Sequence, residues 1–247
     1  MQCAILAGGL GTRLRPITER IPKALVEVCG EPFAHYQLSW LAEQGVDEAV
    51  YLIGYKGELL REFVGDGSRW GLHVRYVDEG ERLRGTAGAL RLAAENGALR
   101  ERFFTLYGDS FLPISLGPVW KAFDERDEAL MTVFRNAGRF DRSNVIYADG
   151  RVALYDKRAE GATAAAMDFI DYGLSVLRRD TVERRIPAGE TADLADLMNA
   201  LSREGRLGGY EVAERFYEVG SPSGLADFEN FAQACGLARG RERACHQ

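Results

Sequence analysis

The stretch Leu6-Ala7-Gly8-Gly9-Leu10-Gly11-Thr12-Arg13-Leu14 comes directly after a short apolar run at residues 3–7. The apolar run predicts a buried β-strand, and the three glycines predict a tight turn where this strand ends. Because glycine has no β-carbon, the backbone N–H groups of such a turn can approach oxygen atoms closely, which suits the binding of phosphate groups. A tight turn whose basic neighbours are merely solvated is the alternative interpretation.

Two basic residues follow the glycines, Arg13 within the turn and Lys23 after Pro22. A planar guanidinium binds two phosphate oxygens at once. The stretch lacks the lysine of a Walker loop at the required spacing, and Leu14 stands where the dinucleotide fingerprint requires a third glycine. An NAD-linked Rossmann protein is therefore disfavoured, and a site for a small polyphosphate is favoured.

The first half of the chain alternates between apolar strand patterns and amphipathic helix patterns. This βαβ rhythm predicts a Rossmann-like three-layer α/β sandwich, with helices on both faces of a mixed, mostly parallel central sheet. The second half is less regular, with strand patterns around a turn at Ala148-Asp149-Gly150. We predict strands at residues 3–7, 49–53, 74–77, 103–107, 130–134, 145–147, 152–155, 169–177, 208–213 and 216–219, and helices at residues 33–44, 57–64, 86–95, 192–204 and near 221–235.

We find no linker, low-complexity segment or internal repeat, so we predict a single domain over residues 1–237. The charged tail, residues 238–247, is expected to be disordered. The net charge of −6 argues against a nucleic-acid binder. No apolar run is long enough for a membrane span. The four cysteines show no disulfide framework and the N-terminus does not resemble a secretory signal, which favours the cytoplasm.

One carboxylate is well placed for a metal–phosphate site. Asp109 follows the predicted strand at 103–107, in the sequence Leu106-Tyr107-Gly108-Asp109-Ser110. Open α/β sheets bind ligands at the carboxyl ends of their strands. Magnesium bound to a triphosphate takes one or two carboxylates in addition to phosphate oxygens and water. A Gly-Asp turn with no ligand is the plainer interpretation of the same residues.

Together, LAGGLGTRLRPIT (residues 6–18) and IPKAL (residues 21–25) resemble the signature of the sugar-phosphate nucleotidyltransferases. The resemblance implies the fold of the nucleotide-diphospho-sugar transferases and a Mg²⁺-dependent reaction in which an NTP and a sugar 1-phosphate give an NDP-sugar and pyrophosphate. It implies catalytic roles for Arg13, which binds the leaving pyrophosphate, and for Lys23, which steadies the α-phosphate. The nucleotide would contact the loop residues Leu6, Ala7, Gly8, Gly9, Gly11 and Thr12.

The same resemblance assigns further residues along the chain. Asp109 matches the metal aspartate of the family, and Glu218, in Tyr217-Glu218-Val219-Gly220-Ser221-Pro222, stands where the second metal aspartate is usual. The segment that contacts the nucleotide base matches at Gly85 and Thr86. An acidic turn just upstream contains Glu79, whose carboxylate can accept hydrogen bonds from N1–H and the exocyclic amine of guanine. A solvated acidic turn is the alternative.

The sugar-phosphate side matches less closely. Lys157 resembles the family lysine that contacts the sugar phosphate and is expected to be catalytic, with Asp156 as its acidic neighbour. Asp171 and Gly173 fall where many relatives carry Asn-Gly-Gly against the sugar hydroxyls, and Tyr172 replaces a glycine between them. This departure leaves the sugar open. An exposed lysine and ordinary strand packing are the alternative interpretations of these residues.

Within the family, the compact length and the pattern around Trp40-Leu41 resemble both the mannose- or mannoheptose-1-phosphate guanylyltransferases and the muramate-type uridylyltransferases. GDP-sugar synthesis of the mannose or heptose type is favoured. A UDP- or dTDP-sugar pyrophosphorylase, a phosphocholine-type cytidylyltransferase and a catalytically inert nucleotide-sugar sensor stay open. The expected partners are an NTP and a sugar 1-phosphate, with no nucleic acid and no membrane. The sequence assigns no oligomeric state, and a dimer is compatible with it.

Overall fold

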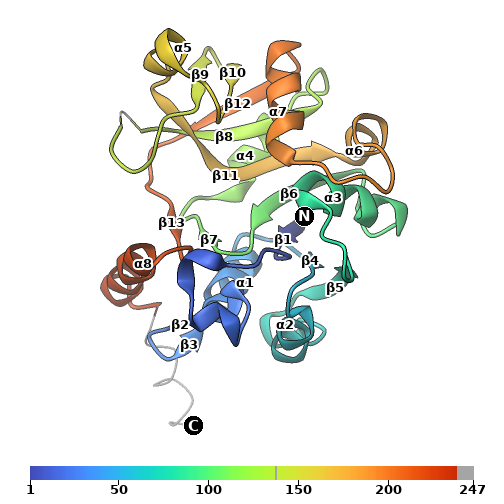
Figure 1. The fold of residues 1–247 in the computed structure, drawn as a ribbon, viewed down its shortest axis with the longest axis vertical. Coiled ribbons are helices and arrows are strands. Elements are labelled where there is room, and N and C mark those ends of the chain that lie inside the picture. The colour runs from blue at the N-terminus through green and yellow to red at the C-terminus, as the bar shows by residue number, and fades with distance from the viewer. Residues whose placement is uncertain (137, 238–247) are drawn as a thin grey trace.

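The computed structural model describes residues 1–136 and 138–237, so the predicted tail lies outside the described residues. Strands and helices alternate through the first half, as the sequence predicts (Figure 1). The elements are β1 (Gln2–Leu6), η1 (Thr12–Leu14), η2 (Ile17–Glu19), η3 (Lys23–Leu25), β2 (Glu27–Val28), β3 (Glu31–Pro32), α1 (Phe33–Glu43), β4 (Glu48–Ile53), α2 (Gly57–Val64), η4 (Ser68–Trp70), β5 (His73–Asp78), α3 (Gly85–Glu95), β6 (Arg102–Tyr107), β7 (Ser110–Phe111), α4 (Leu116–Ala122), β8 (Ala129–Arg135), β9 (Val145–Ala148), β10 (Arg151–Tyr155), α5 (Gly161–Ala165), β11 (Phe169–Arg178), α6 (Arg179–Arg185), α7 (Leu194–Arg203), β12 (Leu207–Val212), β13 (Tyr217–Glu218) and α8 (Pro222–Ala234).

A single mixed sheet of nine strands forms the centre of the molecule, in the order β5-β4-β1-β6-β11-β8-β12-β10-β9. The first four strands in this order are parallel to one another. β11 then pairs antiparallel with both β6 and β8, and among the described strands of the second half only β8 and β12 are parallel to each other. The parallel part therefore matches the βαβ segment of the sequence, and the antiparallel part corresponds to the less regular second half.

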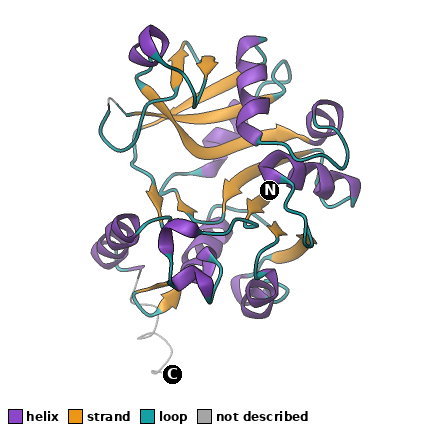
Figure 2. Cartoon of the chain, in the orientation of Figure 1, coloured by secondary structure: helices purple, strands orange, loops and turns teal. Residues whose placement is uncertain are grey.

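Helices cover both faces of the sheet, which makes the three layers of the predicted sandwich (Figure 2). One apolar core includes side chains of α1, α2, α4 and α8, and the other includes side chains of α3, α6 and α7. α8, at the red end of the chain, returns to the first half, where Phe228 packs on Phe33 with ring centroids 5.1 Å apart. The last described helix, α8, thus packs against α1 near the start of the chain.

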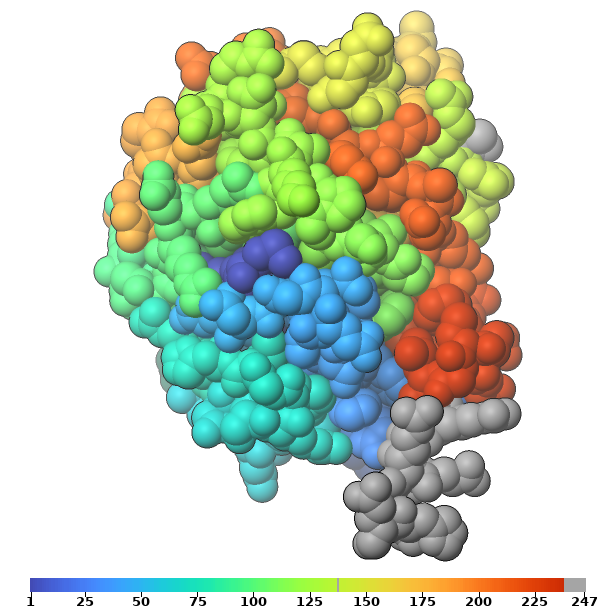
Figure 3. All heavy atoms as spheres, turned by 180° about the vertical axis from the view of Figure 1, so that it is seen from behind, coloured from blue at the N-terminus to red at the C-terminus, as the bar shows by residue number. Residues whose placement is uncertain are grey.

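The amino end of β1 reaches the back of the molecule (Figure 3). There the terminal ammonium of Met1 lies 2.6 Å from Asp47, and the side chain of Gln2 donates a hydrogen bond to Ala98. The carboxyl end of the same strand leads into the glycine-rich loop. The loop therefore begins at the carboxyl ends of the parallel strands, opposite to the chain terminus.

Some predicted boundaries differ from the observed ones for local reasons. The helix predicted at 192–204 begins at Leu194, because the Asp193 side chain accepts a hydrogen bond from Ala195 N and caps it. The strand predicted at 216–219 is only β13, since its partner β7 has two residues. The predicted hairpin turn is present, with positive φ at Asp149 and Gly150. The sequence did not predict the helices α4, α5 and α6.

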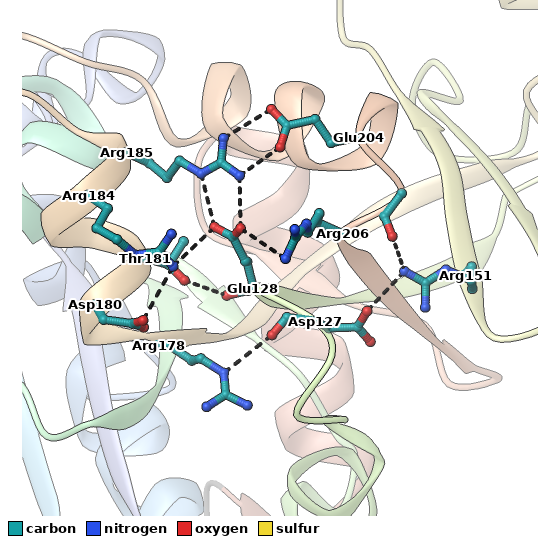
Figure 4. Close-up of polar contacts among 11 residues, drawn as sticks. Asp127, Glu128, Arg151, Arg178, Asp180, Thr181, Arg184, Arg185, Glu204 and Arg206 are labelled. Carbon is teal, nitrogen blue, oxygen red and sulfur yellow. Dashed lines mark hydrogen bonds and ion pairs between the residues drawn. The ribbon is translucent and has the colours of Figure 1, made fainter.

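A cluster of ion pairs fastens α6 to the second half of the sheet (Figure 4). Buried Glu128, just before β8, lies 2.8 Å from Arg185 of α6, and Arg185 also lies 2.7 Å from Glu204. Hydrogen bonds from Arg185 lower the pKa of Glu128. Because α6 packs on α3, this cluster indirectly supports the helix that borders the candidate site. No helix among the described residues has the length and apolar character to cross a membrane.

Candidate functional site

The glycine-rich loop begins where β1 lies between its two parallel neighbours. Leu6 is in register with Leu52 of β4 and with Tyr107 of β6, and Gly108 N donates to Leu6 O at 3.0 Å. The chain leaves the sheet at Gly8. At Gly11 φ is +63°, and a β-carbon there would lie 2.7 Å from Cγ of Lys23. The loop conformation therefore requires glycine at this position, and it brings the loop against Lys23.

Lys23 and Asp109 form an ion pair across the start of the loop. Pro22 precedes η3, and the ammonium of Lys23 donates a hydrogen bond to Asp109 Oδ2. Both side chains stay partly accessible, at 24% for Lys23 and 16% for Asp109. A β-carbon on Gly220 would lie 3.3 Å from a guanidinium nitrogen of Arg13 and 3.3 Å from Asp109 Oδ2. The structure thus brings both cations to the Asp109 carboxylate.

Glu218 joins this group from the far end of the chain. β13 pairs antiparallel with β7, so Glu218 lies opposite Ser110, and Val219 N donates to Asp109 O at 2.9 Å. The Glu218 side chain is open to solvent within a recess. Partial loss of water around it raises its pKa, the charge of Asp109 raises it further, and Arg13 and Lys23 oppose the rise. Two carboxylates and two cations therefore influence one another here.

The donor set fits a magnesium ion that is held mainly by a nucleotide. Within residues 1–136 and 138–237, no group of three or more His, Cys, Asp or Glu side chains is arranged to hold a metal ion. Magnesium usually takes one or two protein carboxylates and completes its shell with phosphate oxygens and water. Asp109 and Glu218 are hard oxygen donors: Glu218 lies on β13, and Asp109 directly precedes the facing strand β7. They are the residues that would hold the ion.

A cavity of about 200 Å³ opens beside Lys23 and Asp109. Glu79 faces this cavity but is itself only 8% exposed, and its burial raises its pKa. Glu79 Oε2 accepts a hydrogen bond from Arg84 N at 2.6 Å, and a β-carbon on Gly8 would collide with Oε1. The predicted residues that line the cavity are Leu6, Ala7, Gly8, Gly9, Lys23, Glu79, Gly85, Thr86 and Asp109.

Other predicted nucleotide contacts lie outside this cavity. Gly11, Thr12 and Arg13 are not among its lining residues, and both Thr12 and Arg13 are exposed. Thr86 lines the cavity, but its hydroxyl donates to Asp193 at 3.0 Å and accepts from Leu194 N at 2.7 Å. Its side chain therefore joins α3 to α7. The loop splits into a part that faces the cavity and a part that faces Asp109 and Glu218.

The predicted sugar-phosphate residues lie at the ends of β10 and β11. Lys157 is exposed, with its ammonium 6.0 Å from the Tyr107 ring and 5.8 Å from the Tyr155 ring. Asp171 Oδ2 accepts from the Tyr155 hydroxyl at 3.2 Å, and Oδ1 accepts from Gly173 N at 3.0 Å. Asp156 accepts from Arg158 N at 2.8 Å and lies 3.3 Å from Arg203.

Some residues of the site were missed by the sequence reasoning. Tyr107 lines the cavity, and its pKa is raised by burial and then by nearby carboxylates, the first of them Asp171. It directly precedes Gly108-Asp109, and that adjacency was the available signal. Leu83 also lines the cavity and packs against Gly54. No pattern in the sequence distinguishes Leu83 from the other residues of its loop.

Comparison with known proteins identifies relatives of this chain. Over 224 residues, 90% of this chain, it is 29% identical to the mannose-1-phosphate guanylyltransferase catalytic subunit beta of Danio rerio, and the chain spans only 62% of that protein. It is 30% identical over 159 residues to the D-glycero-alpha-D-manno-heptose 1-phosphate guanylyltransferase of Aneurinibacillus thermoaerophilus, covering 64% of this chain and 68% of that protein.

A solved structure has the same fold. The crystal structure of HddC from Yersinia pseudotuberculosis superposes with a TM-score of 0.75 at 20% identity, covering 93% of this chain and 98% of that chain. The predicted fold class is thereby confirmed. The family model for nucleotidyl transferases matches residues 3–143, a segment that contains the glycine-rich loop, Lys23 and Asp109. The chain therefore belongs to the nucleotidyl transferase family, as its sequence signature indicated.

Proposed function

We propose that this chain transfers a nucleoside monophosphate from an NTP, with GTP favoured, to a sugar 1-phosphate of the mannose or heptose type. The observation that carries the proposal is the meeting of Arg13, Lys23, Asp109 and Glu218 beside a cavity of about 200 Å³. A nucleotide base fits the dimensions and mixed lining of such a cavity better than a complete sugar nucleotide does. The triphosphate would then extend from the cavity toward the four charged side chains.

The reaction consists of one displacement at the α-phosphorus. A phosphate oxygen of the sugar 1-phosphate forms a bond to the α-phosphorus, the bond to the bridging oxygen of the β-phosphate breaks, and pyrophosphate leaves with that electron pair. Arg13 is placed to take the charge that grows on pyrophosphate, and Lys23 to hold the α-phosphate. A bound Mg²⁺ supplies charge neutralisation between these phosphates. Catalysis is then positioning and electrostatic stabilisation.

The preference for guanine rests on Glu79. Its carboxylate lies in the wall of the cavity, and Arg84 N holds one oxygen in place. The other oxygen, Oε1, makes no hydrogen bond within the described part of the chain. Guanine presents N1–H and an exocyclic amine, two donors that suit a carboxylate, whereas uracil and thymine present one N–H between two acceptors. The guanylyltransferase relatives support the same choice.

The acceptor phosphate is expected at Lys157. This ammonium has two tyrosine rings as neighbours and no carboxylate partner among the described residues. Its charge is therefore available to a phosphate, with Asp171 and Gly173 nearby on β11 for sugar hydroxyls. Asp156 would hold the adjacent backbone through its bond to Arg158 N.

Pyrophosphate release, measured with each NTP against a panel of sugar 1-phosphates and phosphocholine in the presence of Mg²⁺, tests this function. We expect release with GTP and an aldose 1-phosphate. Turnover with CTP and phosphocholine, or turnover of a sugar 1-phosphate with UTP or dTTP but not with GTP, would show that the proposed substrates are wrong. Tight nucleotide-sugar binding without any pyrophosphate release would favour an inert sensor and overturn the proposal.

A further inference from the structure

A second recess begins at Glu218 and is separate from the cavity that Lys23, Glu79 and Asp109 line. It has a volume of about 370 Å³, and Asp171 and Glu218 stand at the side nearest Asp109. Its remaining walls come from the segment after β8, the segment before β13 and the first two turns of α8. The side chains that matter here are Arg139, Phe140, Asp141, Arg215, Ser223 and Asp227.

The floor of this recess is aromatic and well supported. Phe140 is 42% exposed, and its ring centroid lies 5.8 Å from that of Phe134 and 5.9 Å from that of Phe216. The Arg215 guanidinium lies 4.7 Å from the Phe140 ring centroid, and that of Arg139 lies 5.7 Å from it. Proteins build ligand pockets from such apolar surfaces with a few fixed polar groups around them.

Hydrogen-bond donors and acceptors both surround the Phe140 ring. Arg215 lies 2.7 Å from Asp227, which supplies a donor and an acceptor side by side. Arg139 uses Nε and one terminal nitrogen to hold the carbonyl oxygens of Asn136 and Arg135. Beyond Asp171 and Glu218, the two arginines are balanced by Asp141 and Asp227. Such a lining has no excess positive charge with which to bind an acidic group. It suits hydroxyl groups, which both donate and accept hydrogen bonds.

We propose that this recess receives an exocyclic polyhydroxyl chain of the acceptor sugar. The enzyme thereby selects neutral sugar 1-phosphates of seven or more carbons over hexose 1-phosphates. Asp171, which is expected to contact the sugar ring, lines this recess together with Phe140 and Arg215. The space around Phe140 and Arg215 is therefore available to the exocyclic chain of the sugar. A volume of about 370 Å³ lies within the range of about 300–1,000 Å³ in which proteins bury whole small ligands. This inference rests on the proposed function.

A substitution that fills the recess from its rim tests the inference. Ser223 is exposed in the first turn of α8, and Ser221, which caps that helix, is left in place by Ser223→Phe. Ser68→Phe makes the same chemical change at an exposed serine of η4 that lines neither cavity. For both variants and the unmodified protein, kcat/KM is measured with mannose 1-phosphate, a manno-heptose 1-phosphate and a hexuronic acid 1-phosphate. Binding of the heptose 1-phosphate is measured separately by calorimetry.

We expect the unmodified protein to prefer the heptose over the hexose by about tenfold or more. Ser223→Phe should remove this preference by lowering kcat/KM for the heptose alone, and Ser68→Phe should keep it. Equal use of hexose and heptose, a preference for the acidic sugar, or an unchanged preference in Ser223→Phe would overturn the inference. If no sugar phosphate is turned over, the proposed function is wrong. Loss of heptose 1-phosphate binding in Ser223→Phe alone would then still support the recess as its site.

Discussion

Lys23 donates a hydrogen bond to Asp109 Oδ2, and this contact joins residues that are 86 positions apart in the chain. One side chain comes from a short helical turn after the glycine-rich loop and the other from the carboxyl end of β6. Because Gly11 packs directly on the Lys23 stem, the loop, the cation and the carboxylate form one unit. Glu218 and Arg13 complete it from β13 and η1.

Asp109→Ala is expected to lower the rate of pyrophosphate release by at least about 10²–10³-fold, the loss typical of removing one preorganised charge-stabilising group. The side chain is partly accessible, so the fold should persist. Asp124→Ala is a matched control, because it removes a partly exposed aspartate outside the site, whose carboxylate lies 2.9 Å from nearby Arg126. Steady-state kinetics with circular dichroism checks this prediction, which is wrong if Asp109→Ala turns over at a near-normal rate.

Glu218 should make magnesium use depend on pH. Its pKa is raised, mainly by partial loss of water, so it becomes protonated at a higher pH than an ordinary glutamate. As the pH falls through this raised pKa, the carboxylate is lost and the Mg²⁺ concentration for half-maximal activity should rise. Glu218→Gln should show a weak, pH-independent response, and Glu218→Asp should restore the pH dependence. Identical Mg²⁺ titrations of the Gln variant and the unmodified protein would contradict this role.

The same carboxyl group has a consequence for stability. Because the folded-state pKa exceeds the unfolded-state pKa, the unfolded state releases this proton first as the pH rises. The protein without ligands therefore loses some free energy of unfolding between the ordinary and the raised pKa of Glu218. Glu218→Gln should abolish that loss, so the variant should be the more stable one above this interval. Urea unfolding at several pH values measures the difference.

Gly11→Ala should destabilise the protein and misplace Lys23. The residue has φ of +63°, and the new β-carbon would meet Lys23 and Thr18 at 2.7 and 2.9 Å. Such strain costs about 1–3 kcal/mol. Gly9→Ala is the matched comparison, because a β-carbon there meets nothing within 4 Å in the described structure and φ is not positive. Denaturant unfolding should separate the two variants, and equal free energies of unfolding would show that the loop is not constrained at Gly11.

Glu79→Gln should weaken the use of GTP by about 10–100-fold in kcat/KM, as expected from the loss of hydrogen bonds to a charged acceptor worth about 1.5–3 kcal/mol. The loss should be smaller with ITP, since inosine lacks the exocyclic amine. Asp78→Asn is the control, because Asp78 is exposed and accepts a hydrogen bond from Gly80 N within its own turn. If Asp78→Asn alters the GTP-to-ITP ratio and Glu79→Gln does not, the neighbouring acid reads the base instead.

Much of the first half of the fold is encoded locally. The alternation of buried strands and amphipathic helices predicts β1, β4, β5 and β6 as parallel neighbours, since parallel strands need helical crossovers. The second half follows no such rhythm. β11 inserts antiparallel between β6 and β8, and this pairing is a choice among strands distant in sequence, which no local period specifies.

The sequence by itself determined the loop chemistry, because the glycines, Arg13 and Lys23 lie close together in the chain, and the separate Gly-Asp turn directly follows a strand pattern. The resemblance of residues 217–222 to the family suggested a role for Glu218, but only the tertiary structure placed it beside Asp109, through the two-residue ladder between β13 and β7. The tertiary structure also decided that Glu79 is buried in a cavity wall and that Phe140 and Arg215 border one recess. Burial and proximity depend on which strands pair and which loops fold over them, so they arise only when the whole sheet is assembled.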